Sequence, residues 1–126
     1  MKKAIFIILL LLSCSTIIYS CKNDDEQISE IYYGDLEITR LEDINAFTFK
    51  VITGNLTISF ADDITSLEGL SSLTSVGGNL RIFGNQFLRD LGGLENLVSV
   101  GQGLDIYYNA SLVSLKGLEN VTYIGS

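Results

Sequence analysis

The sequence predicts a mainly β protein that coils into a β-solenoid of about four turns, three of 24 residues and one shorter N-terminal turn. Three observations support this prediction. From residue 54 the chain repeats itself without gaps over residues 54–77, 78–101 and 102–125, and a strict period of this kind is typical of stacked repeats. Each copy begins with alternating apolar residues, as a strand does. The later apolar residues of each copy are three apart, which fits neither a regular strand nor a regular helix.

Seven apolar columns recur at equivalent positions of the three copies. A single turn cannot bury its own apolar residues, so we expect them to point inward and to stack on their equivalents in the next turn. Leu91, in the middle copy, should therefore be buried between turns. The columns are Leu56/Leu80/Leu104, Ile58/Ile82/Ile106, Ile64/Leu88/Leu112, Leu67/Leu91/Leu115, Leu70/Leu94/Leu118, Leu73/Leu97/Val121 and Val76/Val100/Ile124.

Glycine and asparagine recur at the bends between these columns. Glycine is favoured where φ is positive or where two backbones approach closely, so we expect both roles at the solenoid corners. Asn85 and Asn109 share one column after the strand, where a buried amide can satisfy turn backbone groups. The glycines are Gly69, Gly93 and Gly117, and Gly77, Gly101 and Gly125.

Residues 28–53 predict an N-terminal cap and the shorter first turn. The strand signature of residues 34–38 recurs 20 residues later, at residues 54–58. We expect the apolar residues before it to close the N-terminal end of the core, since a terminal turn must shield its leucines from water. They are Ile28, Ile31, Tyr32 and Tyr33. The sequence stops at Ser126, where a further strand should begin, and one interpretation is a piece of a longer repeat array.

Residues 1–20 have the pattern of an export signal. Lys2 and Lys3 precede a continuous apolar run at residues 4–12, and this run is short for a membrane-spanning helix. A retained membrane helix is the alternative. Cys14 and Cys21 are the two cysteines of the chain, and both precede the repeats.

This N-terminal region resembles a bacterial lipoprotein signal, in which a cysteine is lipidated and becomes the first residue after cleavage. The resemblance implies Cys21 as the lipidated residue and the start of a tether at residues 21–27, because the polar residues 22–27 after it suit a solvated tether; Cys14 is the alternative. The acidic stretch after Cys21 also resembles the signal that directs lipoproteins of the Bacteroidetes to the outer face of the outer membrane. An ordinary acidic linker is the other interpretation.

The repeat itself resembles the receptor L domain. The resemblance rests on Gly-Asn-Leu-x-Ile followed by Leu-x-x-Leu-x-Gly-Leu-x-x-Leu-x-Ser-Val-Gly, at residues 78–101. It covers residues 54–126 well and residues 34–53 weakly. That family is a right-handed β-helix related to leucine-rich repeats, and it forms ligand-binding lobes of receptors for insulin and epidermal growth factor. The resemblance therefore implies a right-handed solenoid and a binding role, but its motifs are core and turn positions that specify no ligand.

Composition argues against several classes of function. The chain carries 8 Lys+Arg against 15 Asp+Glu, so no basic surface is available for nucleic acid. It has no His, the commonest general base and metal ligand, and its carboxylates form no recognisable acid/base pair. Asp62 and Asp63 suit calcium, but the other copies lack carboxylates there. We therefore expect no enzyme activity, no cofactor and no metal.

The outward positions of the repeated strand hold the residues we predict to bind a ligand. With Leu80 and Ile82 pointing inward, Arg81 and Phe83 point outward, and Asp105 and Tyr107 follow on the next turn. The full outward columns are Glu37/Thr57/Arg81/Asp105 and Ser59/Phe83/Tyr107.

We therefore expect Phe83 to stack on Tyr107 and Arg81 to face Asp105. Exposed paired aromatics suit the binding of a protein or a glycan. The alternative is a cross-strand ladder that only stabilises the sheet. The sequence thus predicts a cell-surface lipoprotein that binds or adheres, and a structural envelope lipoprotein is the second possibility.

Overall fold

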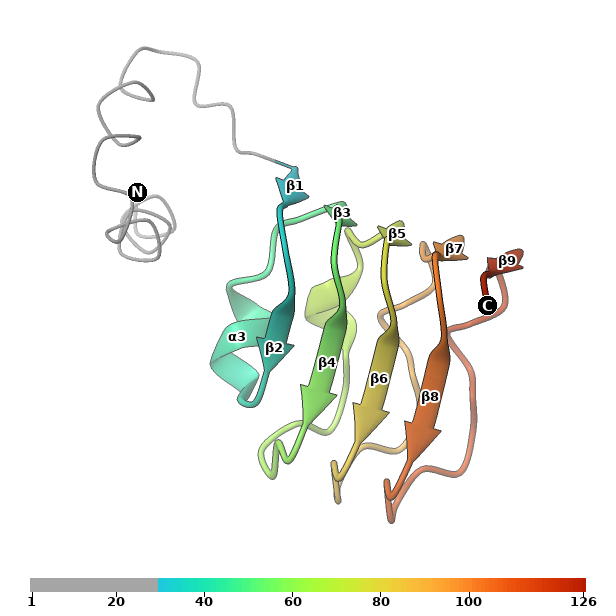
Figure 1. Ribbon diagram of the computed structural model, residues 1–126. Helices are drawn as coiled ribbons and strands as arrows, with labels where there is room; N and C mark the ends of the chain where they lie inside the picture. The colour runs from blue at the N-terminus through green and yellow to red at the C-terminus, as the bar shows by residue number, and fades with distance from the viewer. Residues whose placement is uncertain (1–29) are drawn as a thin grey trace, which may run out of the picture.

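Parallel strands stacked into a β-solenoid of about four turns make up the structure, a computed structural model that describes residues 30–126 (Figure 1). One sheet has four strands in the order β2-β4-β6-β8 and the other has five in the order β1-β3-β5-β7-β9. The four-stranded sheet contains β2 (Leu36–Ile38), β4 (Leu56–Ser59), β6 (Leu80–Phe83) and β8 (Leu104–Tyr107). The five-stranded sheet contains β1 (Ile31–Tyr32), β3 (Val51–Ile52), β5 (Ser75–Val76), β7 (Ser99–Val100) and β9 (Tyr123–Ile124).

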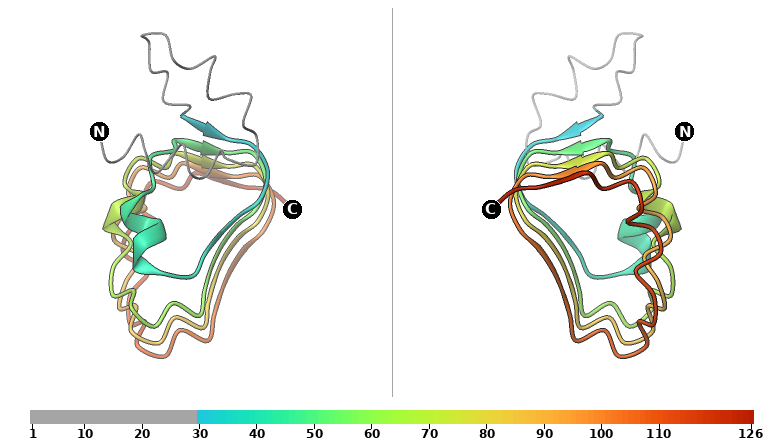
Figure 2. Two further views of the ribbon diagram at one scale, coloured as in Figure 1. Left: turned by 90° about the vertical axis from the view of Figure 1, so that its left-hand side faces the viewer. Right: turned by 90° about the vertical axis from the view of Figure 1, so that its right-hand side faces the viewer.

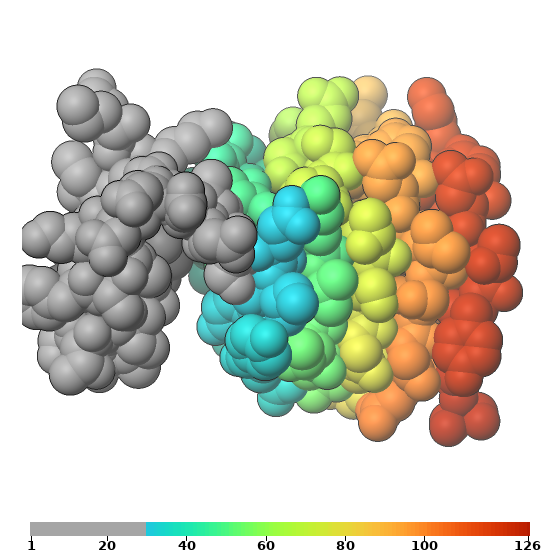
Figure 3. All heavy atoms as spheres, turned by 90° about the horizontal axis from the view of Figure 1, so that it is seen from above, coloured from blue at the N-terminus to red at the C-terminus, as the bar shows by residue number. Residues whose placement is uncertain are grey.

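The register of the strands confirms the predicted columns. Leu56 pairs with Leu80 and Leu80 with Leu104, so residues 24 apart lie side by side. The first turn is offset by 20 residues, as Leu36 pairs with Leu56. Viewed along the solenoid axis, the turns lie almost on top of one another (Figure 2). In the space-filling view they form successive bands across the molecule (Figure 3). The predicted mainly β fold is therefore confirmed.

The third side of the coil carries two short helices in its first two turns. Helix α3 (Leu41–Asn45) and the 3₁₀ helix η2 (Glu68–Leu70) lie next to each other. Asp63 Oδ1 accepts a hydrogen bond of 3.0 Å from the N–H of Leu41, at the start of α3. A Cβ on Gly69 would lie 2.5 Å from the carbonyl oxygen of Ile44. Glycine at this corner therefore lets the two helical turns approach closely.

The core fills the interior of the coil, and it is most complete in the middle turns. All seven predicted apolar positions of residues 54–77 and of residues 78–101 are at most 1% exposed. Leu91 is 0% exposed, as predicted. Each such side chain is shielded by its equivalents on the neighbouring turns, which is how stacked repeats share one core.

The N-terminal end of the core differs from the prediction. Tyr32 packs against the core, and its ring meets that of Phe49 edge to face at 5.1 Å. Ile31 and Tyr33, which we expected to close this end, are 37% and 76% exposed. Alternation along β1 explains the difference, because neighbours of an inward-pointing residue point outward. The predicted export signal with Cys14, the predicted tether with Cys21, and Ile28 lie outside the described residues.

Candidate binding face on the four-stranded sheet

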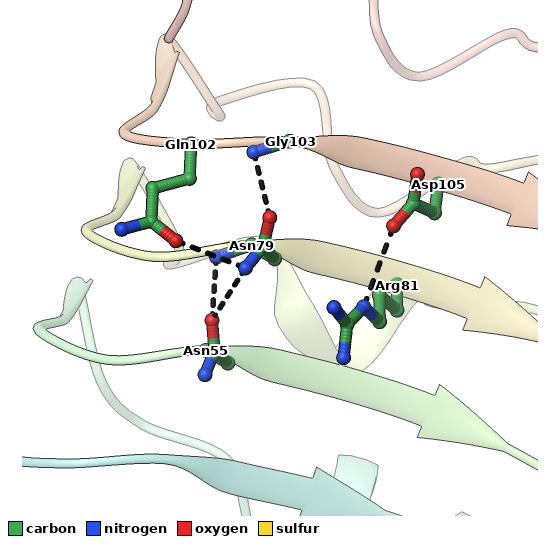
Figure 4. A network of polar contacts seen from close by, with 6 residues as sticks. All are labelled: Asn55, Asn79, Arg81, Gln102, Gly103 and Asp105. Carbon is green, nitrogen blue, oxygen red and sulfur yellow. Dashed lines mark hydrogen bonds and ion pairs between the residues drawn. The ribbon is translucent and has the colours of Figure 1, made fainter. Parts of the chain in front are cut away.

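The outer face of the four-stranded sheet carries the four predicted ligand-binding residues. Arg81 and Asp105 lie opposite each other on β6 and β8, and the Arg81 Nε donates to Asp105 Oδ2 at 3.3 Å (Figure 4). Their side chains are 46% and 49% exposed. An ion pair in such contact with water contributes about 0–1 kcal/mol to folding. Because about half of each side chain is exposed, the pair is also accessible to other molecules.

Phe83 and Tyr107 stack as predicted. Their ring centroids are 4.9 Å apart and their planes differ by 3°, close to the separation of neighbouring strands. Tyr107 is 42% exposed, and Phe83 is half-buried. Each ring therefore covers one face of the other, and both residues remain partly exposed to solvent.

Two further aromatic residues extend this pair, and the sequence analysis missed both. The ring of Phe60 meets that of Phe83 edge to face at 5.2 Å, and the ring of Tyr108 meets that of Tyr107 in the same way at 5.3 Å. Phe60 is 69% exposed and Tyr108 is 84% exposed. We call these four residues, Phe60, Phe83, Tyr107 and Tyr108, the aromatic strip.

Phe60 and Tyr108 occupy an unusual backbone conformation. They lie in one column with Gly84, directly after their strands, and φ is 51° at Phe60, 70° at Gly84 and 54° at Tyr108. They are the two non-glycine residues with positive φ within residues 30–126. This conformation costs an L-residue roughly 1–2 kcal/mol, and bulky residues rarely adopt it. An aromatic ring at these positions is therefore not explained by backbone preference.

Ser59 shares the outward column with Phe83 and Tyr107, yet it is 1% exposed. Its side chain is small and lies beside the larger Phe83 on the paired strand. The Ser59 hydroxyl donates to Glu37 Oε1 at 3.3 Å. The exposed part of this column therefore begins at Phe83.

Asn85 supports the backbone that carries the strip. Its side chain is fully buried. Asn85 Oδ1 accepts the N–H of Ala61 at 3.1 Å, and its Nδ2 donates to the carbonyl oxygen of Ile58 at 2.9 Å. Asn109 repeats the arrangement one turn later, toward the N–H of Asn85 and the carbonyl oxygen of Ile82. The predicted role of these asparagines in satisfying turn backbone groups is confirmed, and Asn85 holds both sides of Phe60.

A second ladder of polar side chains lies at the starts of the same strands. Asn55 Oδ1 accepts the N–H of Asn79 at 2.7 Å, and Asn79 Oδ1 accepts the N–H of Gly103 at 2.8 Å. The Asn79 side chain also contacts Gln102 (Figure 4). Both ends of β6 and β8 are thus tied to the neighbouring turn, so the rings between them are presented on a rigid sheet.

Metal-binding clusters and membrane-spanning helices are both absent from the described part of the chain. Residues 30–126 bring no three or more acidic, Cys or His side chains into a group that could hold a metal ion. Over the same residues, no helix has both the length and the apolar character needed to cross a bilayer.

Comparisons of the chain with protein-family models, with curated proteins and with solved structures found no significant match.

Proposed function

We propose that the chain is a lipid-anchored binding or adhesion module of the cell surface, which holds a protein or a glycan on its aromatic strip. The observation that carries the proposal is the exposure of Phe60 and Tyr108, at 69% and 84%. Aromatic side chains gathered on one exposed face are typical of interaction sites. Arg81, next to the strip, belongs with aromatics to the residue types enriched at binding hot spots.

The second candidate is a structural envelope lipoprotein without a specific ligand. The Phe83–Tyr107 stack favours it, because aromatic pairs across neighbouring strands stabilise a sheet by about 0.2–1 kcal/mol each. A structural role explains the inner pair of rings, Phe83 and Tyr107. It does not explain Tyr108, most of whose surface is in solvent and whose backbone is strained. We therefore prefer the binding module.

The resemblance to the receptor L domain supports the same choice. The repeat motif at residues 78–101 is the part of the chain that carries it, and a parallel β-solenoid is compatible with that family's architecture. As part of the proposal, we assign the chain to the receptor L domain family. The outer face of the four-stranded sheet would then be a ligand-binding surface, as in the receptor lobes of that family.

The membrane anchor is also part of the proposal. Residues 1–20 would be removed as an export signal, Cys21 would carry the lipid, and residues 21–27 would form an acidic tether on the outer face of a bacterial outer membrane. Several acyl chains on one cysteine hold a protein far more firmly than a single chain does. The strip lies along β4, β6 and β8, the second to fourth strands of their sheet, whereas the tether would join the first turn at β1 (Figure 1).

Metabolic labelling with a fatty-acid analogue tests the anchor in cells that produce the full chain. We expect Cys14→Ser to keep the label and Cys21→Ser to lose it. The reverse pattern would move the anchor to Cys14, and label retained in both single variants and in the double variant would contradict lipidation of cysteine.

Binding by the full chain in detergent micelles tests the strip, with glycan arrays and pull-downs of envelope proteins as the two assays. We expect the double variant Phe83→Ala, Tyr107→Ala to weaken binding by about tenfold or more, as the loss of hot-spot residues does. Tyr123→Ala is the matched control, because Tyr123 is 58% exposed but belongs to β9 of the other sheet. Equal binding by the double variant and the control would place the site elsewhere or favour the structural lipoprotein.

A further inference from the structure

The two outer rings of the aromatic strip are turned steeply relative to the two inner rings, which stack on each other. The planes of Phe83 and Tyr107 are parallel to within 3°, and these rings cover each other. The plane of Phe60 is turned by 86° from that of Phe83, and the plane of Tyr108 by 76° from that of Tyr107. Because the outer rings are also the most exposed, they are the part of the strip most accessible to a ligand.

The absence of a side chain at Gly84 leaves room for the ring of Phe60. A Cβ added to Gly84 would lie 2.8 Å from Cδ1 of Phe60 and 2.9 Å from its Cε1. The ring therefore reaches across to the next turn and lies over the glycine. In the column of residues 60, 84 and 108, glycine thus lies between two aromatic residues. The ring of Phe60 occupies the space that a side chain at Gly84 would need.

The surroundings of the strip are polar. The parallel column on the same sheet face holds Thr57, Arg81 and Asp105, of which the last two already pair with each other. Aromatic faces bordered by hydrogen-bonding groups suit a sugar, because a pyranose ring has C–H groups on its faces and hydroxyls around its edge. The formal charge of the chain is −7, which disfavours an anionic polymer.

The dimensions of the sheet favour a narrow ligand over a protein. Four strands of at most four residues give a face of roughly 13 Å by 15 Å, or about 200 Å². A stable protein interface buries about 800 Å² on each partner. A glycan chain that lies along the solenoid axis needs only the width of the strip.

We infer that the aromatic strip binds a neutral glycan, whose pyranose rings stack on the faces of Phe60 and Tyr108 while hydroxyls bond to Arg81 and Asp105. This inference rests on the proposed function and specifies its ligand. It also gives a reason for two aromatic residues at positions where the backbone favours glycine: the rings are placed for a ligand and not for the fold.

Glycine substitutions at the left-handed positions provide the test, because glycine readily adopts positive φ. Phe60→Gly and Tyr108→Gly should therefore fold as the parent chain does, which circular dichroism checks. Tyr108→Phe keeps the ring and serves as the matched control. The full chain in detergent micelles is titrated with neutral oligosaccharides of glucose, mannose, galactose and xylose, and with polygalacturonate as the anionic probe.

We expect at least one neutral oligosaccharide to bind, with its Kd raised about tenfold or more in each glycine variant and changed little in Tyr108→Phe. Binding of no neutral oligosaccharide, binding of polygalacturonate alone, or equal Kd values in the glycine variants would overturn the inference. If any of these occurs while protein pull-downs still depend on Phe83 and Tyr107, the glycan assignment fails and the binding module stands. If pull-downs are also unaffected, the proposed function fails with it.

Discussion

The turn of residues 78–101 and the turn of residues 102–125 have nearly the same apolar residues but different environments. Leu91 is 0% exposed, whereas Leu115, its equivalent, is 57% exposed. Val100 and Ile124 differ in the same way, at 0% and 47%. Within residues 30–126, the first of these turns has a neighbour on both sides, and the second has one on one side only. Position in the stack, and not residue type, thus decides whether a leucine belongs to the core.

Truncation of the two equivalent leucines should show the largest difference between these turns. Leu91→Ala should lower the free energy of unfolding by roughly 2–5 kcal/mol, because it leaves a cavity in a closed core. Leu115→Ala should cost less than about 1 kcal/mol, since most of its side chain is already in water. Urea denaturation of the two variants measures both values. Equal losses would mean that the last turn is covered as fully as the one before it.

The buried asparagines should give a smaller difference of the same kind. Asn85→Ala leaves the N–H of Ala61 and the carbonyl oxygen of Ile58 without their buried partner, which should cost roughly 1–3 kcal/mol. Asn109 makes the equivalent bonds but is only half-buried, so Asn109→Ala should cost less. Thermal unfolding of both variants checks the order, and a greater loss at Asn109 would contradict it.

The period of the repeat explains why the core and the Phe83–Tyr107 pair were predictable. Residues 24 apart must lie side by side once the turns stack, and alternation along the strand then fixes which of them point outward. Arg81 and Asp105 followed from the same reasoning. These four positions needed only the period and the parity of Leu80 and Ile82.

Features that depend on something other than the period escaped prediction. Phe60 and Tyr108 follow their strands in a left-handed conformation, to which alternation does not apply; Gly84, in the same column, was the one signal that could have shown it. Ile31 and Tyr33 were misplaced because the first turn has no preceding copy with which to compare it. Sequence reasoning was thus strong where neighbours repeat and weak at strand ends and at the first turn.

Substitutions at residues 84 and 108 should change the free energy of unfolding in opposite directions. These changes should be smaller than those at the leucines and asparagines. Tyr108→Gly should leave stability unchanged or raise it by up to about 1 kcal/mol, as it relieves a left-handed residue whose ring is 84% exposed. Gly84→Ala should lower stability, because it adds strain at positive φ and its Cβ meets the ring of Phe60. Urea denaturation distinguishes them, and a clear loss in Tyr108→Gly would show that this ring supports the fold.

The backbone N–H groups at the starts of β6 and β8 provide the most direct test of the claim that neighbouring turns determine the environment of a residue. The N–H of Leu80 donates to the carbonyl oxygen of Gly103 at 2.9 Å, just as the N–H of Leu56 donates to that of Asn79. The N–H of Leu104 is its equivalent, but within residues 30–126 no further turn follows to accept it.

Hydrogen exchange followed by nuclear magnetic resonance measures both amides in one sample of the full chain. We predict that the Leu80 amide exchanges near the rate set by global unfolding, and that the Leu104 amide exchanges faster by orders of magnitude. Equal protection of Leu80 and Leu104 would contradict the account, because it would require a partner on the outer edge of β8.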